Sequence, residues 1–160
     1  SEKANKTVRI LFFFDFGSQA SVEMHQKLQI LKEEYQNQIL LEYHSVPLSP
    51  ESRNAAEAAE CARVQGHYQT FQNEVFDHYF GHFETPHMLR LAENIDLDIR
   101  TFTACVKSGI MREKIEAHKR IAQRYPFSSP PYLVVQQDYQ YETMPPLSTL
   151  RNLIDTLLET

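Results

Sequence analysis

The sequence predicts an α/β fold in which a central mixed sheet is interrupted by a helical subdomain. Two stretches rich in aliphatic and aromatic residues, 6–14 and 39–46, flank an amphipathic stretch over residues 19–36. This pattern predicts a strand, a helix and a second, parallel strand. Residues 50–125 carry only helical patterns, and the chain then ends in two short strands and a helix. This order of elements is the basis of the fold prediction.

Each element has its own local signal. The first strand contains the uninterrupted run VRILFFF, so we expect it to be buried on both faces of the sheet. In the next helix, Val22, Leu28 and Leu31 recur at helical spacing. Ser49 and Pro50 predict a capped helix start after the second strand. Further helices are predicted over residues 54–65, 68–79, 85–91, 98–107 and 111–124, a hairpin over 132–136 and 140–143, and a closing helix over 147–158.

Length and charge narrow the functional classes. A chain of 160 residues is long enough for one hydrophobic core, and we expect a single domain. The net charge of -5 argues against nucleic acid or an anionic membrane surface as the main partner. The longest apolar run, Ile10 to Phe14, is far too short to span a bilayer. The first residue is Ser1 rather than Met, so we expect that a preceding segment was removed.

The junction between the first strand and the first helix is the expected place for chemistry. The predicted turn covers residues 15–18, so Ser18 and Ser21 lie at the start of the predicted helix. Unpaired backbone N–H groups and the helix dipole stabilise negative charge there. Serine is also a preferred N-cap residue, so a purely structural role for Ser18 stands beside a functional one.

Four stretches of the chain resemble the DsbA-like family of thioredoxin-fold thiol-disulfide oxidoreductases. They are FFDFG at 13–17, AAEAAECA at 55–62, residues 92–109 ending in CVKSG, and SSPPYLVV at 128–135. The resemblance implies one DsbA-like domain over residues 1–160. Its thioredoxin halves would cover about 6–48 and 128–160, with a helical insertion over about 50–125. It also implies an extended peptide or unfolded protein as substrate, no cofactor, and a periplasmic or otherwise extracytoplasmic location.

The chain departs from the family at the site itself. The two redox cysteines of the family align with Ser18 and Ser21, which would be the catalytic positions. Thiol-disulfide exchange requires a thiolate, and the helix dipole cannot bring a serine hydroxyl into the corresponding pKa range. We therefore expect no disulfide exchange at this site. An engineered Cys-to-Ser variant and a naturally redox-inactive relative both account for the two serines.

Two other functions are compatible with the same serine. Kappa-class glutathione transferases and hydroxychromene-carboxylate isomerases resemble this stretch by placing a serine at the first site position. That resemblance implies that Ser18 donates a hydrogen bond to the thiolate of bound glutathione, a small thiol that would then be the ligand. A non-enzymatic interaction module is the third alternative.

Further site residues are expected around Ser18. The family's Gly-Thr-Pro-Thr strand contains a cis proline, and the resemblance assigns it to Pro130. The backbone of Ser129 would then be free to pair with an extended peptide or with glutathione. Phe16 and His25 are predicted to contribute to substrate binding, although an ordinary helix-surface role for His25 is the alternative.

The remaining reactive residues are cysteines and histidines. Cys61 and Cys105 allow either two buried thiols or one bridge, and the family resemblance favours a structural, non-catalytic disulfide. His78 and His82 share a helix face, but Gly81 interrupts the helix before His87. No metal site is predicted from these histidines. The sequence gives no signal for an oligomeric state.

Overall fold

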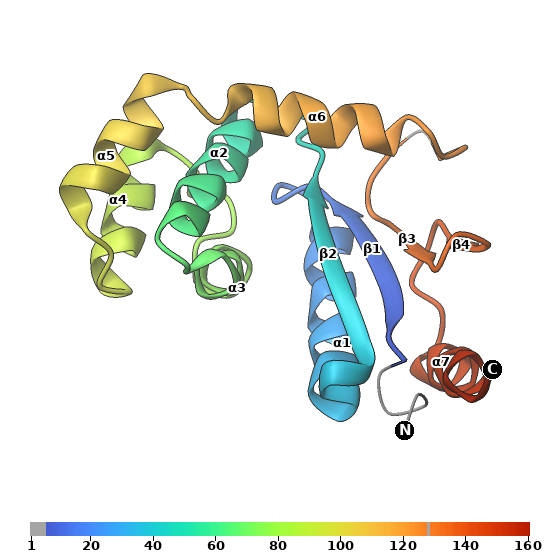
Figure 1. Ribbon diagram of the computed structural model, residues 1–160. Helices are drawn as coiled ribbons and strands as arrows, with labels where there is room; N and C mark the ends of the chain where they lie inside the picture. The colour runs from blue at the N-terminus through green and yellow to red at the C-terminus, as the bar shows by residue number, and fades with distance from the viewer. Residues whose placement is uncertain (1–5, 128) are drawn as a thin grey trace.

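The computed structural model describes residues 6–127 and 129–160. Residues 1–5 of the predicted domain and Ser128, the first residue of the predicted proline motif, lie outside the described residues. The predicted fold class is confirmed: a mixed sheet carries helices, in the predicted order (Figure 1). The elements are β1 (Val8–Phe14), α1 (Gln19–Tyr35), the short 3-10 helix η2 (Gln36–Gln38), β2 (Ile39–Ser45), α2 (Pro50–Val64), α3 (Tyr68–His78), α4 (Thr85–Asn94), α5 (Ile99–Ser108), α6 (Arg112–Ala122), β3 (Tyr132–Val135), β4 (Tyr139–Tyr141) and α7 (Leu147–Glu159).

The sheet has the strand order β2-β1-β3-β4. β1 pairs with β2 in parallel, as the strand-helix-strand pattern predicts, and with β3 antiparallel. β3 and β4 form the predicted antiparallel hairpin. β1 is therefore an interior strand. The turn that follows it lies at the same end of the sheet as the C-terminal end of β2.

Side chains of β1 alternate between two packed layers. Ile10, Phe12 and Phe14 belong to the large core that includes α1 and α7, whereas Leu11 and Phe13 belong to a smaller cluster with residues of β3 and the end of α6. Because side chains on successive residues of a strand point to opposite faces, helices must cover both faces of this strand. This explains why the run is apolar without alternation.

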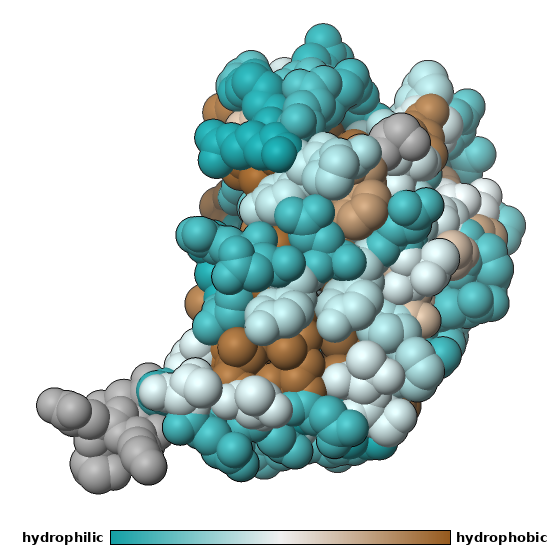
Figure 2. Space-filling model, turned by 90° about the vertical axis from the view of Figure 1, so that its right-hand side faces the viewer, coloured by the Kyte–Doolittle hydropathy of each residue, from teal (hydrophilic) through white to brown (hydrophobic). Residues whose placement is uncertain are grey.

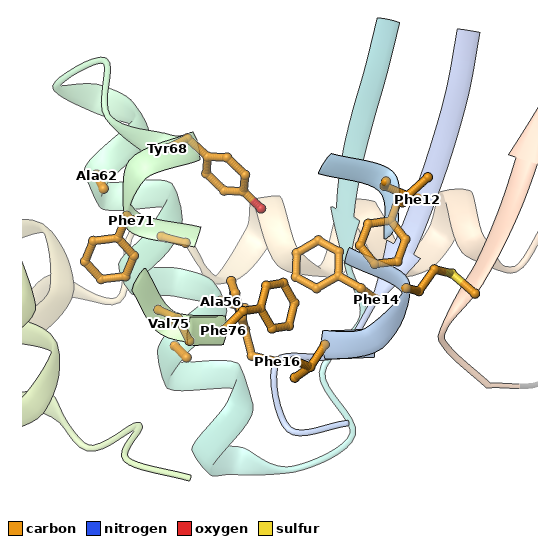
Figure 3. Packing of buried hydrophobic residues seen from close by; sticks show 14 of the residues in the cluster. Phe12, Phe14, Phe16, Ala56, Ala62, Tyr68, Phe71, Val75 and Phe76 are labelled. Atoms are coloured by element: carbon orange, nitrogen blue, oxygen red, sulfur yellow. The ribbon is translucent and has the colours of Figure 1, made fainter. Parts of the chain in front are cut away.

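The helical insertion and the sheet share one core. In Figure 1, α2 to α5 lie to one side of the sheet, and α6 crosses back towards it. Figure 3 shows Phe76 of α3 pointing towards Phe14 and Phe16; the ring centroids are 5.6 and 4.9 Å away. Aromatic rings at such separations pack favourably. The two parts are thus held together by direct packing.

A buried ion pair fixes α6 on α2. The carboxylate of Glu60 is fully buried and accepts from Lys114 Nζ at 2.7 Å and from Arg63 Nε at 2.8 Å. Burial acts to raise the pKa of Glu60, but the hydrogen bonds from Arg63 and Lys114 outweigh it, and the pKa is lowered. Removing one partner of such a pair leaves an uncompensated buried charge. α6 therefore has a defined position over the sheet.

The predicted bridge between Cys61 and Cys105 is present. Its S–S distance is 2.06 Å, and it ties α2 to α5. These are the two cysteines of the sequence, so the chain has no free thiol. Phe102 is the buried anchor of α5, and the bridge adds a covalent one.

The face of the molecule that Figure 2 shows is mainly polar. Figure 2 shows the face at the right of Figure 1, with a brown area in its lower part. At this height lies α7, which carries the partly buried Leu153 and Leu157. Among the described residues, no helix combines the length and apolar character needed to cross a membrane.

Candidate functional site

The turn between β1 and α1 is closed by hydrogen bonds to one residue, Asp15. Its carbonyl oxygen accepts from Ser18 N at 3.0 Å, and its Oδ1 accepts from Gly17 N at 3.1 Å. Asp15 itself is buried. The chain therefore reverses in a fixed geometry and presents Ser18 at the start of α1.

Ser18 and Ser21 lie together, as predicted, and both bind backbone. Ser18 Oγ accepts from Ser21 N at 3.1 Å, so Ser18 is the N-cap of α1. Ser21 is fully buried, and its Oγ accepts from Asp15 N at 3.1 Å. The capping role considered for Ser18 is confirmed. Ser21 has a related role, because its Oγ accepts from the backbone N–H of the residue directly after β1.

A cavity opens beside this helix start. It has a volume of about 340 Å³ and lies between α1, the proline segment and the chain after β4. Met24 and Met144 give it apolar surface, and Glu23, Lys27 and Glu142 give it charges of both signs. The complete lining is Ala20, Glu23, Met24, Lys27, Pro131, Glu142, Thr143 and Met144.

The prediction of a cis bond before Pro130 is wrong by one position. The cis peptide bond joins Pro130 to Pro131. β3 starts at Tyr132, so Pro131 is the residue directly before the strand. The family resemblance assigns the cis bond to the first of the two adjacent prolines instead. The residue before the cis bond is thus Pro130 rather than Ser129, and it has no N–H and offers only its carbonyl oxygen.

Ser129 and Pro130 line a different cavity from Pro131. The space that they border has a volume of about 320 Å³ and is shared with α6 and the residues after β2. Pro130 is buried and Ser129 is exposed. The proline segment therefore separates two hollows, and only the one beside Pro131 includes residues of α1.

Phe16 and His25 lie in the core. Phe16 is 1% exposed and packs on Phe14 and Phe76. His25 is 2% exposed, its ring lies 4.6 Å from that of Phe76, and its Nε2 is 2.9 Å from Asn73 Oδ1. Burial lowers the pKa of His25 to about 4, so it is neutral at neutral pH. A direct substrate contact by either ring would require this packing to open.

Several cavity residues were not found from the sequence. Glu142, Thr143 and Met144 follow β4 and reach α1 only through the antiparallel return of the chain. No local motif marks them. Lys27 could have been found, since it follows Ala20 and Glu23 at helical spacing on one face of α1.

The histidines considered for a metal do not gather into a site. His78 Nδ1 bonds Glu74 at 3.0 Å, and the rings of His82 and His87 lie 5.1 Å apart. Within residues 6–127 and 129–160, no group of three or more His, Cys, Asp or Glu side chains is arranged to hold a metal ion.

Comparisons with known proteins agree with this architecture. A family model described as thioredoxin matches residues 1–156. No curated protein sequence matches the chain. Among solved structures, the thiol-disulfide exchange protein alpha-DsbA2 from Wolbachia pipientis superposes with a TM-score of 0.85 at 20% identity, covering 96% of this chain and 83% of that one.

Two further structures are similar over nearly the same length. A thioredoxin-like oxidoreductase from Silicibacter pomeroyi DSS-3 has a TM-score of 0.84 at 24% identity, with 99% of this chain and 90% of that chain covered. Oxidised BdbD from Bacillus subtilis has a TM-score of 0.83 at 15% identity, with 96% and 88% covered. At these identities the structures establish the fold, and the family model establishes the family. The chain belongs to the thioredoxin family and has the DsbA-like form of its fold.

Proposed function

We propose that this protein is a DsbA-like relative without redox activity at α1, which binds an extended segment of an unfolded protein in the cavity beside Ala20 and Pro131. The observation that carries the proposal is that serines, and not cysteines, occupy the start of α1. Ser18 and Ser21 stand where the family resemblance places the redox cysteines, and the two cysteines that the chain has are joined elsewhere. Thiol-disulfide exchange needs a thiolate, and this helix start has none.

The cavity supports binding of polypeptide. Apolar surface from Met24 and Met144 is combined with charges from α1 and from the segment after β4, as in sites where apolar side chains are held among orienting polar groups. The Wolbachia and Bacillus structures each cover 96% of this chain, and the first is described as a thiol-disulfide exchange protein. We infer that this chain keeps the binding surface and has lost the nucleophile. The Cys61–Cys105 bridge supports an oxidising, extracytoplasmic location.

Binding of reduced, carboxymethylated α-lactalbumin tests the proposal. Ala20 is exposed at the start of α1, so Ala20→Trp fills the cavity without disturbing the core. We expect about tenfold weaker binding in fluorescence anisotropy, which is about 1.4 kcal/mol. Gln26→Trp, at an exposed position of the same helix outside the cavity lining, is the matched control and should bind like the parent chain. Equal affinities of all three proteins would refute the assignment of this cavity.

The glutathione alternative is favoured by one feature of Ser18. Its Oγ accepts the capping hydrogen bond, and no acceptor for its own hydrogen is found among the described residues. The hydroxyl is therefore available to donate to a thiolate. Calorimetry with reduced glutathione distinguishes the two functions: heat of binding that is lost in Ser18→Ala supports a glutathione site, and no heat at millimolar glutathione excludes it.

A further inference from the structure

A second groove lies on the other side of the proline segment, between α6 and the chain that links β2 to α2. It consists of two adjoining hollows, which share Pro47, Leu48 and Lys119 as walls. The hollow next to Pro130 has a volume of about 320 Å³, and the hollow next to the start of α2 about 550 Å³. Neither includes a residue of the cavity beside Ala20.

The two hollows differ in chemistry. Val46, Phe127 and Tyr132 give the first hollow its apolar surface, which is about half of its lining. The second is polar and is lined by Arg53, Arg112 and Lys119, with Glu57 as its one carboxylate. A continuous groove thus has an apolar end and a cationic end.

The cations of α6 point to an anionic occupant. Arg112 and Lys119 are seven residues apart and lie on one face of the helix, with Glu116 between them. Glu116 Oε1 already bonds Arg53 Nη1 at 2.9 Å. Neither Arg112 nor Lys119 makes an ion pair within the part of the chain that the structure describes. In a chain with a net charge of -5, this concentration of cations along one wall favours a negatively charged ligand.

The groove walls are pre-formed. α6 is fixed by the buried pair between Lys114 and Glu60 and by the buried side chains of Ile115 and His118. Opposite it, Ser49 caps α2 and holds the 46–50 segment in place. Leu48 is 62% exposed at the wall shared by both hollows, where it offers an apolar contact to a ligand that occupies them both.

We propose that this groove binds an acidic extended peptide segment, with an apolar side chain in the Val46–Phe127–Tyr132 hollow and carboxylates beside Arg112 and Lys119. The proposal is independent of the function assigned to the cavity beside Ala20. A peptide fits better than a small anion because the groove presents apolar and cationic surface in succession along its length.

The probe is a short fluorescein-labelled peptide in which a leucine is followed by two glutamates. We expect saturable binding in fluorescence anisotropy. The double variant Arg112→Glu with Lys119→Glu should bind at least about tenfold more weakly, since it reverses the cationic wall. The matched control is Arg90→Glu with Lys107→Glu, which makes the same change in net charge at exposed positions outside the groove and should bind like the parent chain.

Three further measurements keep the proposal open to refutation. Leu48→Ser alters an exposed side chain, so the fold is preserved, and it should weaken binding severalfold. Ala20→Trp should leave binding of this peptide unchanged. A peptide with lysines in place of the glutamates should not bind. Equal binding of acidic and basic peptides, an unchanged affinity of the wall variant, or no binding of the acidic peptide would each overturn the proposal, provided that thermal unfolding shows the variants to be folded.

Discussion

The starts of α1 and α2 have the same spacing of serines but use them differently. In α2, Ser49 Oγ accepts from Ser52 N at 3.1 Å and Ser49 N donates to Ser52 Oγ at 3.4 Å, a reciprocal capping box. In α1, Ser18 Oγ accepts from Ser21 N at the same 3.1 Å, but Ser21 Oγ accepts from Asp15 N. The first arrangement is closed within the helix, whereas the second ties the helix to the preceding strand.

The two starts are also neighbours in space. A Cβ atom built on Gly17 would lie 3.4 Å from Ser52 Cβ, so the turn before α1 passes directly against the first turn of α2. The start of α1 faces the cavity beside Ala20, and the start of α2 borders the cationic groove. The comparison teaches that serines with this spacing satisfy backbone N–H groups at both helix starts. What distinguishes α1 is its surroundings.

The largest expected effect comes from introducing thiols at α1. The double variant Ser18→Cys with Ser21→Cys should catalyse the reduction of insulin by dithiothreitol, because a helix N-terminus stabilises a thiolate and the adjacent cavity can hold the substrate. The parent chain, which has no free thiol, should show only the uncatalysed rate. The rate of insulin precipitation measures the difference.

The matched control is Ser49→Cys with Ser52→Cys, which places the same spacing at the start of α2. Ser52 and Ser21 are equally buried, so the two variants match in this respect, but the start of α2 borders the cationic groove and not the cavity beside Ala20. We expect the uncatalysed rate for this variant. Equal catalysis by both variants would show that any helix start with this spacing suffices, and inactivity of both would argue against an oxidoreductase ancestry of the α1 site.

Much of the fold could be predicted because its signals are local. The apolar run of β1, the helical period of α1 and the Ser49-Pro50 start of α2 are short-range patterns, and the structure confirms each. The pairing of Cys61 with Cys105 came from the family resemblance and is also confirmed.

The rest of the site depends on contacts between distant segments. Met144 reaches α1 only after β3 and β4 have formed a hairpin. Glu60 is one of two glutamates in an alanine-rich run, and nothing in the run indicates that Lys114 will pair with it. The proline assignment failed for a different reason. Two adjacent prolines fit the same pattern, and only the start of β3 distinguishes them.

The next largest effect is a loss of folding stability at acidic pH. It comes from two buried histidines, one on α1 and one beside the strand that leads to α2. His25 lies on α1, and His118 Nδ1 is 3.4 Å from Ser45 Oγ at the end of the strand that leads to α2. Burial lowers the pKa of each from 6.5 to about 4. Glu60 opposes this shift at His118, whereas His44, Lys114 and Arg63 add to it.

The direction of the pH effect on stability follows from the number of protons that the folded and the unfolded chain bind. Between about pH 4 and pH 6.5 the unfolded chain binds more protons than the folded one, so stability is full above about pH 6.5 and falls as the pH drops towards 4. The loss is on the order of 3 kcal/mol for each histidine. Urea unfolding between about pH 7 and pH 4.5 measures it. His25→Asn and His118→Asn should each reduce the slope by a similar amount, and an unchanged slope in either variant would remove that histidine from the explanation.

The smallest expected effect is a difference in stability between variants of Ser21 and Ser52, which compares the two helix starts directly. Ser21→Ala leaves the buried Asp15 N–H without its acceptor, so we expect a loss of about 2 kcal/mol in the free energy of unfolding. Ser52→Ala removes the bonds that Ser52 Oγ makes with the N–H, the carbonyl oxygen and the Oγ of Ser49, at 3.4, 3.3 and 3.0 Å. Ser49 is only partly buried and its Oγ still caps the helix, so water can replace these bonds and the loss should be about 1 kcal/mol or less. Urea midpoints of the two variants at neutral pH give the difference. Both side chains are fully buried and both changes remove one hydroxyl, but only Ser21→Ala leaves the N–H of the buried Asp15 without an acceptor. Equal losses would mean that Ser21, like Ser52, contributes only to its own helix start, and the tether between β1 and α1 would then lie in the carbonyl and carboxylate of Asp15 alone.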